Sequence, residues 1–111
     1  MARKPEGWRG SGVEDFLADQ IRNLAFRMAF SEARARRIKR ALAETVRKFR
    51  EARGLSQAAV AKRAKTTQAV VSRIENPAVP YLPSIEVLAR LAVALGANLE
   101  IALVPSSRTA A

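Results

Sequence analysis

The chain has 111 residues, a net charge of +10, and neither Cys nor His. This length suits one compact domain with an arm, and a composition that is 49% hydrophobic but only 5% aromatic suits packed helices. Without Cys or His, disulfides, thiolate metal sites and the commonest general base are excluded, so we expect no catalytic residue, no metal site and no cofactor. No apolar run approaches the length of about 18 residues that a membrane helix needs. We therefore expect a cytoplasmic protein with no membrane partner.

The basic charge is concentrated in the middle of the chain. Residues 31–53 contain nine Lys and Arg against three Asp and Glu. Such a cluster attracts the phosphate backbone of nucleic acid, although anionic lipid or an acidic protein would also be attracted. Nucleic acid is the favoured partner, and the alternative is an ordinary solvated helix face.

The first half of the chain predicts two helices. Ser11 and Glu14 have the spacing of a capping box, and a helix over residues 12–30 would align Val13, Phe16, Leu17, Ile21, Leu24 and Met28 on one face. Ser31 is a candidate cap for a second helix, which Gly54 would end. Its apolar stripe is Ile38, Leu42, Val46 and Phe49, and the charges lie mostly off that stripe, at Arg36, Arg37, Lys39, Arg40, Arg47, Lys48 and Arg50.

Two short helices, over residues 56–63 and 67–75, follow with only Ala64, Lys65 and Thr66 between them. So short a turn forces two helices to cross steeply, and the small Ala61 allows them to approach closely. Three prolines then indicate a loop, after which Ser84 is expected to cap a last helix that Gly96 closes.

Residues 98–104 alternate like a β-strand, with Leu99, Ile101 and Leu103 on one side. A lone strand cannot satisfy its own backbone groups, so we expect it to pair with its copy in a symmetric homodimer. The alternative is an extended tail lying on the core. Three segments follow from this pattern: residues 1–30 as a tail and amphipathic helix, 31–97 as the main helical domain, and 98–111 as a dimerisation strand and tail.

The stretch LSQAAVAKRAKTTQAVVSRIENP, residues 55–77, resembles the helix-turn-helix of the Xre family of lambda-repressor-like domains, and the similarity extends over residues 42–96. The resemblance implies an all-α fold in which a five-helix DNA-binding domain carries the N-terminal helix and the C-terminal strand as additions. It also implies that Gln57 contacts phosphate and braces Gln68, and that Lys65 replaces the usual glycine of the turn.

Apart from the resemblance, the residue pattern predicts a recognition helix at residues 67–75. Thr67 would cap it, leaving Gln68 and Ala69 in its first turn, where short side chains face base edges. A Gln pairs with the adenine edge and an Ala meets the thymine methyl. The candidate DNA-binding residues are therefore Gln57, Lys65, Thr67, Gln68, Ala69, Ser72 and Arg73. Two alternatives stay open, namely that Arg73 pairs with a carboxylate and that Ser72 faces the core.

The closing strand resembles that of antitoxins of the HigA and HipB type, which implies a dimeric repressor that binds a palindromic operator in double-stranded DNA and neutralises a toxin. The N-terminal helix would then offer Phe16, Ile21 and Leu24 to the toxin, or pack on its own core or dimer mate. The alternative functions are a stand-alone phage or host regulator without a toxin, and a toxin inhibitor with little affinity for specific DNA.

Overall fold

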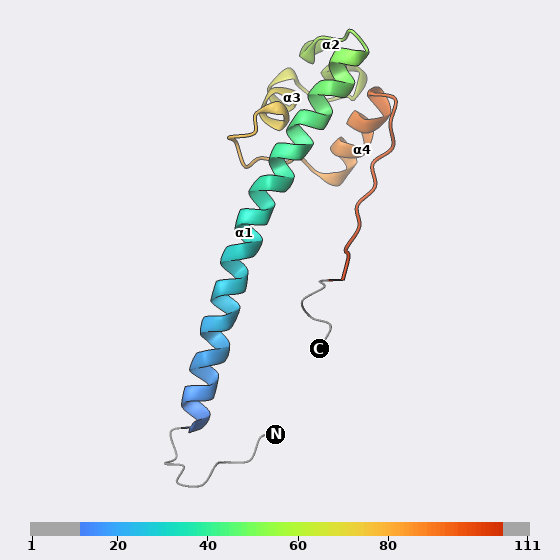
Figure 1. The fold of residues 1–111 in the computed structure, drawn as a ribbon. Helices are drawn as coiled ribbons and strands as arrows, with labels where there is room; N and C mark the ends of the chain where they lie inside the picture. Colours follow the sequence, from blue (N-terminus) through green and yellow to red (C-terminus); the bar gives the residue numbers. More distant parts are fainter. Residues whose placement is uncertain (1–11, 106–111) are drawn as a thin grey trace. The chain divides into compact units, whose positions relative to one another are not determined.

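The computed structural model describes residues 12–105 and divides the chain into two units, Met1–Ile38 and Lys39–Ala111. Four helices are present in the described part: α1 (Gly12–Ala52), α2 (Gln57–Arg63), α3 (Gln68–Glu75) and α4 (Ile85–Ala94) (Figure 1). The all-helical prediction is confirmed for these residues. None of the described helices is long and apolar enough to cross a membrane.

Helix α1 joins the two helices that the sequence predicted separately. Gly and Pro are absent between Gly12 and Gly54, and good helix formers surround Ser31. Instead of capping a new helix, the Ser31 hydroxyl donates to the carbonyl of Met28, 2.7 Å away, within the same helix. The expected break before residue 31 was therefore wrong. Ser11, the other candidate cap, lies outside the described residues.

In the first unit, the described residues form only the N-terminal part of α1, from Gly12 to Ile38. Its large apolar side chains are exposed, and Phe26 and Phe30 meet edge to face with ring centroids 5.1 Å apart. The exposed set is Val13, Phe16, Leu17, Ile21, Leu24, Phe26, Met28, Phe30 and Ile38.

The second unit holds the hydrophobic core. The C-terminal part of α1 contributes Val46, and the three shorter helices supply the remaining buried side chains, because each turns one apolar face inward. These are Val60, Ala61, Ala64, Val71, Ile74, Leu88, Leu91 and Leu95. The predicted small residue at the crossing, Ala61, is buried as expected.

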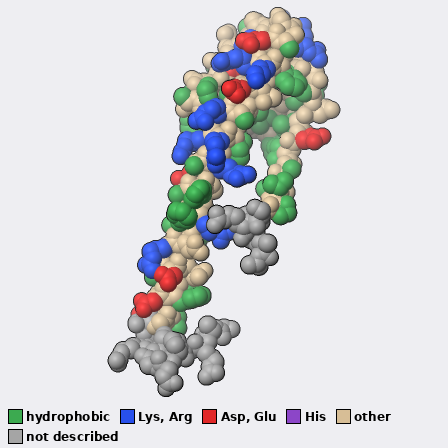
Figure 2. All heavy atoms as spheres, viewed as in Figure 1, with side chains coloured by type: hydrophobic (Ala, Val, Ile, Leu, Met, Phe, Trp, Pro, Cys, Tyr) green, Lys and Arg blue, Asp and Glu red, His purple; other side chains and the backbone are tan. Residues whose placement is uncertain are grey.

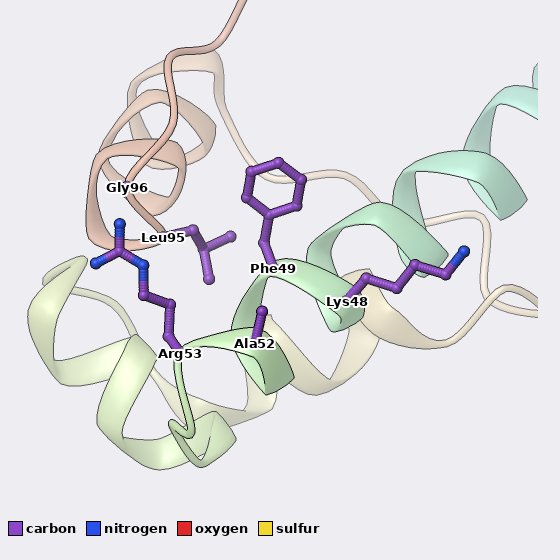
Figure 3. Close-up of a pocket in the computed structure, with 6 residues that line it drawn as sticks. All are labelled: Lys48, Phe49, Ala52, Arg53, Leu95 and Gly96. Carbon is purple, nitrogen blue, oxygen red and sulfur yellow. The ribbon is translucent and has the colours of Figure 1, made fainter.

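Helices α1, α2 and α4 end in the same way, with a residue of positive φ just past the cap. Gly54, Lys65 and Gly96 have φ angles of 65°, 57° and 79°. After each, the next amide returns to a carbonyl five residues back, as in a Schellman motif. A hollow of about 370 Å³ lies beside the last of these ends (Figure 3). A Cβ at Gly96 would lie 1.6 Å from the Arg53 guanidinium, but that exposed side chain can move aside, so it is the positive φ that favours glycine here.

The C-terminal strand is not formed. Residues 97–105 run in an extended path without secondary structure, so the described residues contain no β-strand. The physical reason is that a strand needs a backbone partner, and the single chain supplies none along this segment. The predicted five-helix core was also wrong, because residues 12–105 contain four helices in all.

Candidate nucleic-acid interface

The turn between α2 and α3 is a tight Schellman end. The Lys65 amide donates to Lys62 O at 3.2 Å and the Thr66 amide to Ala61 O at 2.9 Å. This geometry places Lys65 in the left-handed region, where a side chain costs about 1 kcal/mol relative to glycine. Lys65 stands where the resemblance implies a turn glycine, so the strain falls on a residue with a side chain. Its exposed side chain lies on the turn that joins the two helices of the motif.

Helix α4 holds this turn in place through Arg90. The Arg90 Nε donates to the carbonyl of Ala64 at 2.9 Å, and an Nη lies 3.5 Å from the carbonyl of Lys65. Both carbonyls lie at the C-terminal end of α2. Carbonyls there lack intrahelical donors, and the helix dipole favours a positive charge. A side chain from a third helix thus helps to fix the orientation of α2 relative to α3.

Helix α3 has one buried face and one exposed face. Val71, Ile74 and Glu75 are buried, while the opposite positions are exposed, namely Gln68, Ala69, Ser72 and Arg73. The Thr67 hydroxyl caps the helix by accepting from Val70 N at 3.2 Å, as predicted. The structure therefore gathers four of the candidate DNA-binding residues on a single outward surface, which we call the α3 outer face.

Neither alternative for the later residues of this face is observed. Ser72 is exposed and does not face the core. Arg73 lies over the ring of Tyr81, with 5.5 Å from the guanidinium carbon to the ring centroid. A cation–π contact of this kind orients the guanidinium while leaving its N–H donors available.

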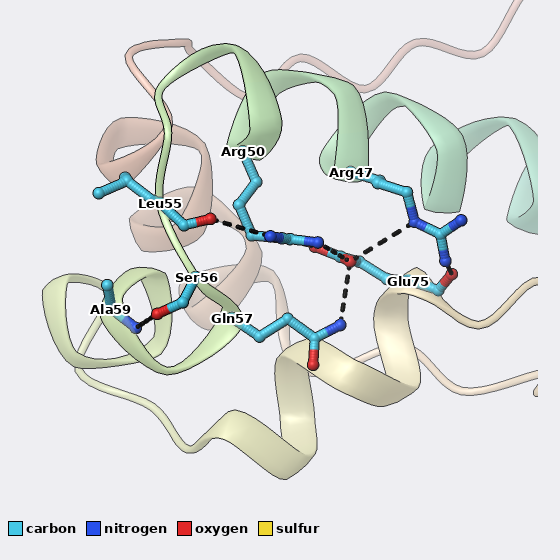
Figure 4. A network of polar contacts seen from close by, with 7 residues as sticks. All are labelled: Arg47, Arg50, Leu55, Ser56, Gln57, Ala59 and Glu75. Carbon is cyan, nitrogen blue, oxygen red and sulfur yellow. Dashed lines mark hydrogen bonds and ion pairs between the residues drawn. The ribbon is translucent and has the colours of Figure 1, made fainter.

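A buried carboxylate joins α3 to the two preceding helices (Figure 4). Arg50 donates from Nε to Glu75 Oε2 at 2.6 Å and from Nη2 to Oε1 at 2.9 Å, and Gln57 Nε2 donates to Oε1 at 3.0 Å. Arg50 also donates to the carbonyl of Leu55 at 2.9 Å, and Arg47 Nε lies 3.8 Å from Oε1. The side chain of Glu75 is 1% exposed, so these partners compensate a charge that water does not reach.

The same contacts decide the protonation of Glu75. Burial alone would raise the pKa of its carboxyl, because desolvation disfavours the charged form. The hydrogen bonds from Arg50 and Gln57 and the charges of Arg50 and Arg47 outweigh that effect, so the pKa of Glu75 lies below its ordinary value. The hydrogen bond between Arg50 and Glu75 also raises the pKa of Arg50. The pair is ionised at neutral pH.

Gln57, the first residue of α2, therefore has a structural partner that the resemblance did not suggest. It was expected to brace Gln68, but its amide donates to Glu75 at the other end of α3. Half-buried at the start of α2, it still lies at the amino end of the first motif helix.

A second buried charge, Lys39, fixes the chain that follows α3. Its Nζ donates to the carbonyls of Arg73, Asn76 and Val79 at 3.1, 2.7 and 2.7 Å. Three ammonium donors are thus matched by three acceptors at a helix end and in a loop. Burial lowers the pKa of Lys39, since the ammonium is removed from water. Neither interpretation left open for the basic cluster, contact with nucleic acid or an ordinary solvated helix face, applies to this buried residue.

The other charges of residues 36–48 remain at the surface. Arg36, Arg37, Arg40, Arg47 and Lys48 are exposed, and Figure 2 shows Lys and Arg side chains concentrated along the middle of α1. These groups give the basic cluster the solvent access that contact with phosphate requires.

The remaining candidate residues lie apart from the α3 outer face. Leu99 is half-buried and packs against the core, whereas Ile101 is 68% and Leu103 is 99% exposed. A cavity of about 220 Å³ lies between α1, α4 and residues 97–100. Phe16, Ile21 and Leu24 belong to the first unit, where all three are exposed.

Sequence reasoning missed both buried charges and Arg90. A signal for Glu75 was present, because it follows Val71 by four residues and Ile74 by one, and so falls on the apolar face of α3. An acid at such a position is buried and requires a cationic partner. For Lys39 and Arg90, whose partners are backbone carbonyls of distant segments, the sequence offers no comparable signal.

The comparisons with known proteins agree with this geometry. The model of a family described as a helix-turn-helix domain matches residues 41–103, which include the whole of α2, α3 and α4. No curated protein and no solved structure gives a significant match.

Proposed function

Because the chain belongs to the helix-turn-helix domain family, we propose that it is a transcriptional repressor of the Xre type that binds a palindromic operator as a homodimer. The family itself indicates a DNA-binding regulator rather than an enzyme. The observation that carries the proposal is the α3 outer face, where exposed polar side chains stand on a helix whose opposite face is anchored by Glu75. Recognition helices in the major groove are built in this way.

Each residue of the interface has a distinct role in the proposal. Gln68 pairs with an adenine edge and Ala69 contacts a thymine methyl, because both lie in the first turn of α3. Thr67, Ser72 and Arg73 contact phosphates or neighbouring bases, while Lys65 and Gln57 contact the backbone from the turn and from α2. The capped amino end of α3 also favours the negative charge of a phosphate.

In this proposal, the two copies of the chain pair through residues 98–104. Ile101 and Leu103 are exposed apolar side chains on an extended segment, which supports pairing with a second copy. Replacing Ile101 and Leu103 together with Asp should weaken the dimer in sedimentation, whereas Ala102→Asp should have a much smaller effect. Equal effects of the two variants would contradict pairing through this side of the segment.

The direct test is selection of bound sequences from a random duplex library. A dimeric repressor should enrich two inverted half-sites whose centres lie about 10 base pairs apart, or a multiple of one helical turn. A Gln68→Ala variant should enrich a site that has lost its preference at one position of each half-site. Recovery of unrelated sequences by the wild type would contradict specific recognition.

A second candidate function adds the neutralisation of a toxin. The exposed apolar side chains Phe16, Ile21 and Leu24 favour it, because an amphipathic helix can occupy a groove of another protein. The test is co-expression with the protein encoded beside the gene. An antitoxin should restore growth that this neighbour arrests, and Phe16→Asp should abolish the rescue while operator binding persists. If the protein encoded beside the gene does not arrest growth, the result favours a stand-alone regulator without a toxin.

A further inference from the structure

The N-terminal part of α1 carries an exposed stripe with heptad spacing that is apolar at every position except Ser31. Going along the helix, the positions alternate by four and three residues, and we call this set the seam: Leu17, Ile21, Leu24, Met28, Ser31, Ala35 and Ile38. All of its large members are more than half exposed. Spacing of 3.5 residues sustained over three heptads is typical of coiled coils rather than of a helix packed on a globular core.

We propose that residues 17–38 form a parallel, in-register, two-stranded coiled coil with a second copy of the chain. The seam residues then occupy the a and d positions, with Ile21 and Met28 at a, and Leu17 and Leu24 at d. A β-branched residue at a combined with Leu at d favours two strands. The aromatic side chains Phe26 and Phe30 lie outside the seam, at positions f and c.

Charge complementarity sets the orientation. Arg27 falls at g and Glu32 at the following e, so a parallel coil brings Arg27 of each copy beside Glu32 of the other. The other g positions, Gln20 and Arg34, face Ala25 and Lys39, and the ammonium of Lys39 is held by backbone carbonyls of its own chain. An antiparallel coil places g beside g and would therefore set Arg near Arg instead of near Glu. Both arrangements are two-fold symmetric, so the charges and not the symmetry decide between them.

The coil ends where the second unit begins. Lys39, the next e position, is committed to three backbone carbonyls, and Ala43 is buried. Leu42, the next a position, packs against the hydrophobic core. These residues are therefore unavailable to a partner helix, and Ile38 is the last seam residue. The inference does not depend on sequence-specific DNA binding, and it assigns Ile21 and Leu24 to the dimer mate rather than to a toxin.

The absence of cysteine from the chain permits a clean test in the full-length protein. A parallel coil places each d residue next to its own copy, within the Cα separation of about 4.4–6.8 Å that a disulfide spans. Leu17→Cys and Leu24→Cys should each give cross-linked dimers on mild oxidation. Phe26→Cys, on the opposite side of the same helix, is the matched control and should remain uncrosslinked.

Other outcomes overturn the proposal in distinguishable ways. Cross-linking only in mixtures of Ile21→Cys with Ile38→Cys would indicate an antiparallel pair, in which each a position faces a d position of the other copy. Seam cysteines that stay unpaired while sedimentation shows a dimer would mean that the two copies meet through another surface and not through the seam. Cross-linking of Phe26→Cys at the same rate as Leu24→Cys would indicate random collision. Specific operator binding is measured separately, so failure of the coil leaves the repressor proposal intact.

A charge exchange tests the pairing of Arg27 with Glu32. In a background with Asp at positions 101 and 103, Arg27→Glu should weaken dimerisation by roughly three- to thirtyfold, since two symmetric pairs are lost. Adding Glu32→Arg should restore most of the affinity, because the pairs reform with reversed polarity. Additive weakening by the two substitutions would rule out contact between these residues.

Discussion

Arg50 on α1 holds Glu75 on α3 through two parallel hydrogen bonds, Nε to Oε2 at 2.6 Å and Nη2 to Oε1 at 2.9 Å. Glu75 belongs to the same helix as the proposed reading residues, but its side chain points to the opposite side. The orientation of the α3 outer face therefore depends on an ion pair that is largely buried on the other side of the helix.

Glu75→Gln should destabilise the fold by about 3 kcal/mol, because it leaves the Arg50 guanidinium largely buried without its carboxylate. Urea denaturation measures the loss. Glu44→Gln, which changes an exposed acid on the same helix as Arg50, is the control and should change stability little. Equal stabilities of the two variants would contradict the structural role given to the pair.

The contribution of Glu75 to the stability of the fold should decrease as the pH falls. Its pKa is lowered in the folded state, so its stabilisation is complete above the unfolded value of about 4.3 and is lost as the pH falls through the folded value. The difference in stability between wild type and Glu75→Gln should be constant near neutrality and should shrink below about pH 4. A difference that grows in acid would mean that the sign of the pKa shift is opposite.

Gln68→Ala should weaken binding to the selected operator by about 1–3 kcal/mol and leave binding to random duplex nearly unchanged. Fluorescence anisotropy with both duplexes at one salt concentration measures the difference. Gln20→Ala, in the first unit, serves as the control. An equal loss on both duplexes would show that Gln68 contacts the backbone rather than a base.

Two substitutions of Lys65 separate strain from charge. Lys65→Gly should stabilise the fold by about 1 kcal/mol, since glycine accepts the positive φ, whereas Lys65→Ala keeps the strain. Both should weaken binding to all duplexes alike and lower the slope of affinity against salt by about 1. Unchanged salt dependence in both variants would remove Lys65 from the interface.

Lys39→Met should destabilise the second unit by about 2 kcal/mol, because the side chain fits but three carbonyls lose their donor. Lys48→Met, at an exposed position of the same helix, should have little effect. Thermal unfolding of both variants measures the contrast, and matching midpoints would refute the importance of these hydrogen bonds.

The sequence predicted the features that depend on neighbouring residues. Thr67 and Ser84 cap their helices, and Gly54 and Gly96 end theirs, because each acts on amides or carbonyls within a few residues. Ser31 failed as a cap because the same hydroxyl can donate back to the preceding turn of a continuing helix. The choice between these two local bonds depends on the helix as a whole.

Features that depend on distant segments were not predictable. Lys39 and Arg90 donate to carbonyls 25 or more residues away, and no periodicity in the sequence identifies such acceptors. The strand over residues 98–104 was predicted from alternation alone, but alternation identifies two faces and provides no backbone partner. The proposed site residues on α3 fell on one face because helical spacing alone decides that arrangement.

The division of α3 into an anchored face and an outer face has a consequence for engineering. Val71, Ile74 and Glu75 hold the helix, and none of them belongs to the α3 outer face. The identities at positions 68, 69, 72 and 73 can therefore be randomised with little loss of folding. If the proposed function holds, libraries at these four sites should yield variants that select new DNA sequences on an unchanged scaffold, provided that Arg50, Lys39 and Arg90 are retained.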